Sequence, residues 1–233
     1  MLHGFLPALL EGAVITLGVA GASLLIAVVL GLVGAAAKLS RVPLIRWVAT
    51  AYTTIVRGVP DLVLMLLIFY GGQLAVNASA SALGYDDYID IDPLIAGVST
   101  IGFIFGAYLA ETFRGALIAI PVGQREAGLA LGMSHTNIFA RITLPQMARL
   151  AIPGFTNNWL VLVKSTAIVS VIGLTDMMHR AGLAAGATRE PFTFYLAAGV
   201  IYLLITTVSL LLLRAIEKRV TVGMRRAASG MTR

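Results

Sequence analysis

The sequence predicts an all-α integral membrane protein, and three observations support this fold class. The 233-residue chain is 58% apolar, only 12% of its residues are charged, and its mean hydropathy is +0.91. A soluble domain carries about twice that share of charged residues. Uncharged or nearly uncharged runs recur along the chain, and each has the length of about 20 residues that a helix needs to cross a bilayer. This composition excludes most soluble enzymes and the disordered and fibrous classes.

Five transmembrane helices are expected in one transmembrane domain covering residues 1–233. Each crossing should be helical, because lipid offers no partner for unpaired backbone groups. Prolines support the boundaries, since Pro60, Pro93 and Pro191 each suit the first turn of a helix. The expected spans are about 12–37, 60–82, 93–119, 151–174 and 192–214, with a cytoplasmic loop at about 121–149.

The distribution of basic residues predicts the orientation. The segments 38–57 and 125–149 and the tail from Arg214 hold four, three and six of the 17 Lys and Arg residues. The opposite loops hold only Arg180 and Arg189. Because basic residues accumulate on the cytoplasmic side, the N-terminus is expected outside and the C-terminus inside. The net charge of +6 is therefore attributed to membrane topology rather than to a nucleic-acid partner.

Motifs for catalysis and for metal or nucleotide binding are missing from the sequence. Without cysteine the chain has no disulfide, thiolate metal site or cysteine nucleophile. His3, His135 and His179 lie far apart in sequence, so we expect no metal site. No phosphate-binding Gly-x-x-x-x-Gly-Lys-Ser/Thr run occurs, so the chain is not expected to bind ATP. We expect a protein that is not an enzyme, with no catalytic residue and no cofactor of its own.

The loop between the third and fourth spans has the composition of a helical hairpin. Ala, Leu and Glu favour a helix over residues 124–131, and Gly132 suits its C-terminal end. Ser134 can cap a second short helix, which we expect to end before Pro145. Such a hairpin, with small residues at Ala127 and Gly128, could dock on another protein. On composition alone it could equally lie as an amphipathic hairpin at the membrane surface.

The spacing within this loop resembles a known signature. Glu126-Ala127-Gly128, then Gly132, and then Ile142-x-Leu-Pro145 is similar to the EAA signature of the permeases of binding-protein-dependent ABC importers. The chain departs from it at Gly128, where that family usually has Ala. The resemblance implies the type I ABC importer permease (MetI-like) fold and a bacterial inner membrane location. It also implies that Glu126, Ala127, Gly128, Gly132, Ile142 and Pro145 dock on a cytoplasmic ATPase subunit.

Further stretches resemble the polar amino-acid branch of these permeases: Arg57-Gly58-Val59-Pro60, residues 107–115 and Lys164-Ser165-Thr166. Residues 52–71 and 89–93 are similar to members that import histidine, lysine, arginine and ornithine. The resemblance implies that the chain forms half of a translocation path with a homologous second permease subunit. It also implies a periplasmic amino-acid-binding protein and an ATPase dimer that binds ATP and Mg²⁺. The alternatives are a permease for opines, glutamine or another polar amino acid, and a stand-alone channel or secondary carrier.

Three ionisable residues in the spans are candidates for the substrate path or gate, because charges at mid-bilayer are costly. Glu111 is expected to pair with Arg114, three residues along the same helix, or else to line the path. Asp61 begins the second span, where the helix dipole stabilises an anion, and it is also a candidate for cation selectivity. Lys164 is expected to form an ion pair or carbonyl contact between helices, or else to contact the substrate carboxylate.

Overall fold

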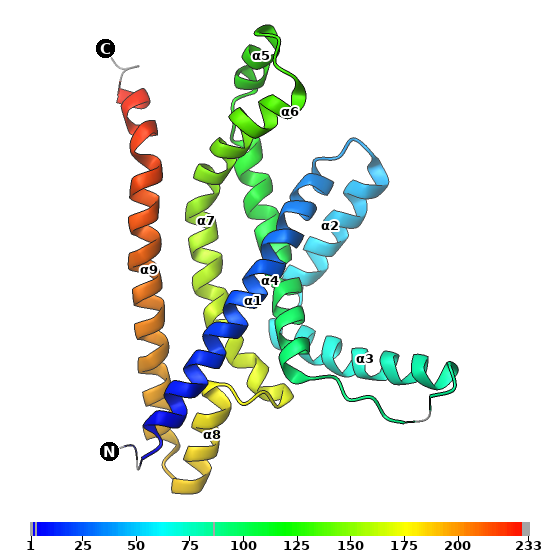
Figure 1. The fold of residues 1–233 in the computed structure, drawn as a ribbon, viewed down its shortest axis with the longest axis vertical. Helices are drawn as coiled ribbons and strands as arrows, with labels where there is room; N and C mark the ends of the chain where they lie inside the picture. Colours follow the sequence, from blue (N-terminus) through cyan, green and yellow to red (C-terminus); the bar gives the residue numbers. More distant parts are fainter. Residues whose placement is uncertain (1, 3, 86, 230–233) are drawn as a thin grey trace.

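The computed structural model describes residues 2, 4–85 and 87–229, and all regular structure in these residues is helical (Figure 1). Five helical stretches are long and apolar enough to cross a membrane, which confirms the predicted fold class. In chain order the elements are α1 (Leu6–Lys38), α2 (Pro43–Gly58), α3 (Asp61–Ala82), α4 (Pro93–Ile118), α5 (Val122–Ala130), α6 (His135–Ile138), the π-helical turn η1 (Phe139–Thr143), α7 (Leu144–Ser165), the 3₁₀ segment η2 (Thr166–Ile172), α8 (Met177–Thr188) and α9 (Pro191–Ser229).

Helices α1 and α4 form the centre of the molecule, and glycines allow them to approach closely. A Cβ atom placed on Gly102 would lie 2.7 Å from the Cβ atom of Ile26. One placed on Gly34 would lie 2.8 Å from the Cβ atom of Ala110. Both distances are shorter than real side-chain contacts, so the crossing requires the absence of a side chain at these positions. Small residues have the same role in other membrane helix pairs.

The basic segment after α1 contains the helix α2, although the sequence predicted no helix between the first two spans. Pro43 occupies the first turn of α2, where its fixed φ favours a helix and its missing N–H costs nothing. Ala49, Thr53 and Val56 are buried on one face of α2. Arg46 and Arg57 leave only residues 47–56 uncharged between them, so the segment has too few consecutive apolar residues to resemble a span.

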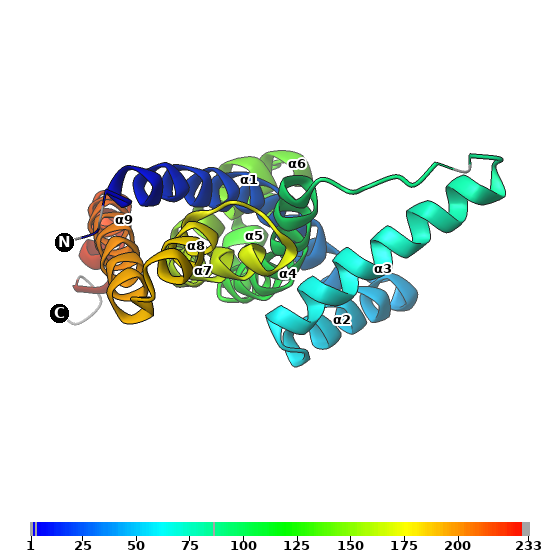
Figure 2. The same cartoon turned by 90° about the horizontal axis from the view of Figure 1, so that it is seen from below.

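The chain turns sharply between α2 and α3. Val59 is extended, with φ −104° and ψ 138°, because the proline that follows disfavours helical backbone. Helix α3 then runs crosswise to α1, α4, α7 and α9 (Figures 1 and 2). Its first turns are anchored by Leu64 and Met65, which are buried, whereas Leu67 and Leu74 are 62% and 74% exposed. Most of the apolar surface of α3 is thus left uncovered by the described part of this chain.

The end of the molecule that carries the N-terminus has a second, smaller core. Leu9 from α1 and Phe194 from α9 are fully buried there, together with small residues of α8. Asp176 is the N-cap of α8, and its Oδ1 atom accepts a hydrogen bond of 2.9 Å from the His179 N–H. Asp176 is 1% exposed, and its Oδ2 atom has no hydrogen-bond partner in the described residues. Burial raises the pKa of this carboxyl group above its ordinary value.

Candidate functional site

The hairpin of α5 and α6 projects from one end of the helix bundle, far from the beginning of α1 (Figure 1). Gly132 follows the C-terminal cap Leu131 of α5, and its φ of +74° is accessible mainly to glycine. The Met133 N–H donates to the Gly128 carbonyl at 3.0 Å, and the Gly132 N–H donates to the Leu129 carbonyl at 2.9 Å. This pair of bonds is the Schellman motif, which closes a helix C-terminus. The predicted stop at Gly132 is therefore confirmed.

The second arm of the hairpin packs on Gly128. A Cβ atom at this position would lie 2.9 Å from Cγ1 of Ile138 and 3.2 Å from Cδ1 of Ile142. Gly128 is the buried residue of α5, so the absence of a methyl group lets the two arms close together. The Oγ atom of Ser134 accepts a hydrogen bond of 3.3 Å from the Asn137 N–H, which confirms the predicted cap of α6.

The outer surface of the hairpin is formed by side chains that are free to contact another molecule. Glu126 and Ala127 are exposed. Within the described part of the chain, the Glu126 carboxylate has no hydrogen bond or ion pair. Successive residues of a helix are rotated by about 100°, so Ala127 faces away from the Val122 and Leu129 side of α5. The hairpin thus presents a small residue and an unpaired carboxylate at its outer surface.

The second arm does not end before Pro145, and this expectation was wrong. Helix α6 runs through η1 directly into α7, with Pro145 in the first turn of α7. A proline has no N–H to donate to the carbonyl four residues earlier, so a regular helix would lack one bond here. The wider π-helical turn immediately before Pro145 accommodates that missing bond, and the helix continues. The hairpin is consequently joined to a span without a flexible linker.

A second polar group of residues lies where α2, α3, α4 and α7 meet. We call Arg57, Asp61, Tyr108 and Ser165 the hinge cluster. The Ser165 hydroxyl donates to Oδ2 of Asp61 at 3.5 Å, and the guanidinium carbon of Arg57 lies 5.5 Å from the centre of the Tyr108 ring. The latter distance allows a cation–π contact. Tyr108 also lies within electrostatic range of both Asp61 and Arg57, so the four residues form one group.

Lys164 adjoins the hinge cluster but does not form the expected contact between helices. Its side chain is exposed in the last turn of α7, and no hydrogen bond or ion pair joins it to any residue that the structure describes. The helix becomes 3₁₀ directly after Ser165, which places Lys164 near the end of α7 rather than at mid-span. Sequence analysis missed Tyr108 and Ser165, although both lie within stretches that resemble the amino-acid permeases.

Glu111 belongs to an ion-pair network rather than to an open path. Its Oε2 atom accepts a hydrogen bond of 2.9 Å from Nε of Arg114, which confirms the predicted pair. Its Oε1 atom is paired with Lys38 at the end of α1, and the Lys38 ammonium also donates to the Thr53 hydroxyl at 2.7 Å. The network therefore connects α1, α2 and α4. Sequence alone missed Lys38 because it was counted only among the charges that set the topology.

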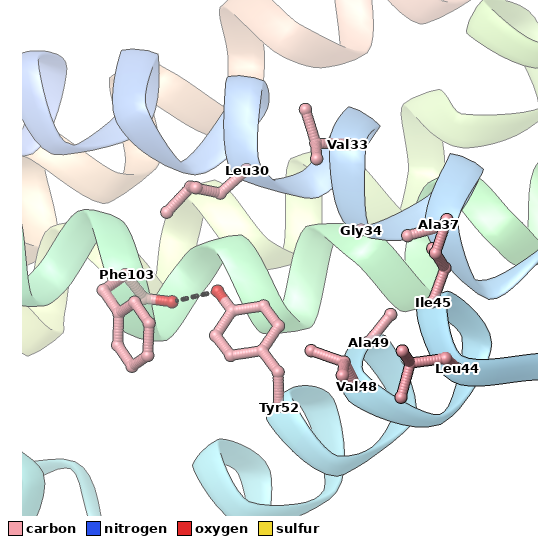
Figure 3. A pocket seen from close by; sticks show the side chains of 10 residues that line it. All are labelled: Leu30, Val33, Gly34, Ala37, Leu44, Ile45, Val48, Ala49, Tyr52 and Phe103. Atoms are coloured by element: carbon pink, nitrogen blue, oxygen red, sulfur yellow. Dashed lines mark hydrogen bonds between the residues drawn. The ribbon is translucent and has the colours of Figure 1, made fainter.

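An apolar groove of about 510 Å³ lies between α1, α2 and α4 and is not suited to a charged substrate (Figure 3). Its lining residues include Leu30, Val33 and Val48. Of the ten residues drawn, Tyr52 carries the one polar side chain, and its hydroxyl donates to the Phe103 carbonyl at 2.6 Å. Among the described residues there is also no group of three or more His, Cys, Asp or Glu residues that could hold a metal ion.

Comparisons with known proteins agree with this architecture. The histidine/lysine/arginine/ornithine transport system permease protein HisQ of Salmonella typhimurium is 52% identical over 227 residues, covering 97% of this chain and 99% of the relative. The octopine transport system permease protein OccQ of Rhizobium radiobacter is 40% identical over 218 residues, covering 94% and 92%. A crystal structure of an amino acid ABC transporter with histidines superposes with a TM-score of 0.79 at 32% identity, over 92% of this chain and 95% of that one.

These relatives are permease subunits rather than ATPases, and ABC importers of this kind combine a permease with an ATPase and a binding protein. Residues 6–222 match the family model for the inner membrane components of binding-protein-dependent transport systems. The match covers nearly the whole chain, from the start of α1 into α9. The chain therefore belongs to this family and is an inner membrane permease subunit of an ABC transporter.

Proposed function

We propose that this permease subunit imports histidine and the basic amino acids lysine, arginine and ornithine, together with a homologous second permease subunit. The proposal is supported by the relative that is 52% identical over nearly the whole chain, whose name gives these substrates. The second permease subunit would cover α3, where apolar side chains such as Leu67 and Leu74 are exposed. A periplasmic binding protein would deliver the amino acid to the face opposite the hairpin.

The hinge cluster carries the substrate proposal, because it combines opposite charges in one place. The carboxylate of Asp61 would attract the cationic side chain of the substrate, and the guanidinium of Arg57 would pair with its α-carboxylate. Arg57 lies against the Tyr108 ring, so its charge is held in position without an acid partner in the described residues. The corner at Val59 and Pro60 places both charges at the junction of four elements. Lys164, exposed beside Ser165, would be a second contact for the substrate carboxylate.

Coupling to ATP hydrolysis would run through the α5–α6 hairpin. Glu126 and Ala127 would contact the ATPase, while Gly128, Gly132, Ile142 and Pro145 would maintain the hairpin and its junction with α7. ATP and Mg²⁺ would be held by that partner, with no cofactor in this chain. The excess of basic residues in segments 38–57 and 125–149 supports a cytoplasmic position for the hairpin. The N-terminus would then lie outside and the C-terminus inside.

The substrate assignment is tested by uptake into proteoliposomes that contain the complete transporter. Asp61→Asn should reduce arginine uptake more than uptake of a neutral amino acid, because only the cation loses a charge partner. Asp87→Asn is the matched control, since Asp87 is exposed in the loop before α4 and lies outside the hinge cluster. Equal losses for both substrates would show that Asp61 has only a structural role at the start of α3.

The coupling assignment is tested by measuring uptake and ATP hydrolysis together. Glu126→Gln and Gly132→Ala should both lower the amount of amino acid imported per ATP hydrolysed. Normal uptake in both variants would refute docking through the hairpin.

A permease for opines is the second candidate, favoured by the 40% identity to the octopine permease. Faster uptake of octopine than of arginine would favour that candidate, whereas uptake without any ATPase would indicate a stand-alone carrier.

A further inference from the structure

A cavity of about 580 Å³ lies between the ends of α1 and α4 and the α5–α6 hairpin. We call it the interfacial cavity. Its apolar wall includes Leu39 after α1, Ile118 at the end of α4, and Val122 and Leu129 on α5. Its volume is within the range of about 300–1,000 Å³ that is usual for small-molecule sites. The cavity is separate from both the hinge cluster and the groove of Figure 3, because they share no residue.

The polar side of the interfacial cavity offers hydrogen-bond donors with positive charge. Arg125 from α5 and His135 from α6 line it, and none of its lining residues is acidic. Neither side chain has a hydrogen bond or ion pair with the residues described here. An arginine offers five N–H donors in a planar arrangement, and a histidine offers at least one donor in either protonation state. Both side chains are exposed, and an anion would match their donors.

The apolar rim indicates what kind of anion fits. Leu39, Ile118 and Val122 are 45%, 58% and 67% exposed, although they lie where the spans of α1 and α4 end. A free phosphate would use the two donors and leave this apolar surface in water. A phospholipid would use both, with its phosphate on the donors and its acyl chain along the rim. Basic pockets between membrane helices on the cytoplasmic side bind lipid headgroups in this way.

We propose that the interfacial cavity binds an anionic phospholipid of the leaflet on the hairpin side, with its phosphate at Arg125 and His135. Residues Val122, Arg125 and Leu129 recur on one face of α5, whereas Ala127 lies on the other face. Ala127 would therefore meet the ATPase on the face opposite the lipid, whereas Glu126, four residues after Val122, would lie beside the lipid-facing side. This consequence for coupling rests on the proposed docking of the hairpin, whereas lipid binding itself does not.

Lipid binding is tested on the purified transporter by native mass spectrometry, with phosphatidylglycerol and phosphatidylcholine as probes. Arg125→Gln combined with His135→Gln should reduce retained phosphatidylglycerol about tenfold, which corresponds to the loss of one charged hydrogen bond or more. Arg46→Gln is the matched control, because Arg46 is an exposed arginine of the same predicted leaflet outside the cavity. The control should retain phosphatidylglycerol like the unmodified chain.

Two results would overturn the proposal: equal retention of phosphatidylglycerol by the double variant and the unmodified chain, or its displacement by inorganic phosphate alone. A second measurement compares uptake per ATP hydrolysed in nanodiscs with and without phosphatidylglycerol. The unmodified transporter should depend on this lipid and the double variant should not. Because retention is measured without ATP turnover, failure of hairpin docking would change only this second result.

Discussion

The network of Lys38, Glu111 and Arg114 allows a quantitative test of what holds α1 on α4. Glu111→Gln preserves shape but removes the charge that faces both cations. Breaking a fully buried ion pair costs about 3–5 kcal/mol, and a hydrogen bond to a charged group contributes about 1.5–3 kcal/mol. The Lys38 and Glu111 side chains are 12% and 18% exposed, so water screens the loss only in part. We therefore expect a destabilisation of about 2–3 kcal/mol.

The assay is thermal unfolding of the purified protein in detergent, followed by the fluorescence of its two tryptophans. For a chain of this size the expected loss lowers Tm by about 5–10 °C. Glu11→Gln is a matched control, because Glu11 also forms an ion pair, with Arg180 at 2.8 Å, but is 68% exposed. An exposed pair contributes about 0–1 kcal/mol, so the Tm of the Glu11→Gln variant should change by no more than about 3 °C.

A double-mutant cycle with Lys38→Met then isolates the contact between α1 and α4. With Glu111 already neutral, removing the ammonium should cost at least about 1 kcal/mol less than it does in the unmodified chain. The physical reason is that the largely buried ammonium of Lys38 would otherwise face a neutral amide and the Thr53 hydroxyl in place of a carboxylate. If the effects of the two single substitutions add up to that of the double variant within about 0.5 kcal/mol, this pair contributes nothing and the reasoning fails.

Substitutions at Asp176, Gly102 and Gly132 test three further features of the structure. Burial raises the pKa of Asp176, so the folded state holds this proton more tightly than the unfolded chain, and stability should fall as pH rises from about 4 through the folded pKa. In thermal unfolding from acid to neutral pH, Asp176→Asn should retain the α8 cap and flatten this dependence, whereas Asp176→Ala should lose about 1 kcal/mol of cap energy at every pH. Gly102→Ala should destabilise the α1–α4 crossing by about 1–3 kcal/mol. Gly18→Ala is the control, because a Cβ atom there meets open space, and it should be neutral or stabilising by up to about 1 kcal/mol. A loss of stability at Gly18 as large as at Gly102 would refute the packing argument. Gly132→Ala should strain the end of α5 by about 1–2 kcal/mol, which hydrogen exchange of the α5 amides would detect as reduced protection.

The positions of the apolar helices and the main features of the hairpin were predictable from local chemistry. Hydrophobic runs define spans because lipid imposes helical structure on any crossing segment. Gly132 and Ser134 were predictable as a helix end and a helix cap because each acts through its own backbone or through a residue three positions away. These effects do not depend on distant parts of the chain, so residue type and spacing were sufficient.

The contacts that join distant segments could not be derived in the same way. Lys38 and Glu111 are 73 residues apart, and Asp61 and Ser165 are 104 apart, so no spacing rule brings them together. The resemblance to amino-acid permeases drew attention to Arg57 and Lys164 but gave no geometry for either. The continuation of the helix through Pro145 was also missed, because a π-helical turn has no simple sequence signal.

The unbroken passage from α6 through η1 into α7 has a mechanical consequence. Helix α7 joins the hairpin at Leu144 to Ser165 of the hinge cluster, and its 22 residues span about 33 Å. Over that length, a tilt of about 5° imposed at the hairpin would displace Ser165 by roughly 3 Å relative to Asp61. Their hydrogen bond of 3.5 Å could not survive such a shift. A small movement of the hairpin is thus enough to separate Ser165, at the far end of α7, from Asp61 on α3.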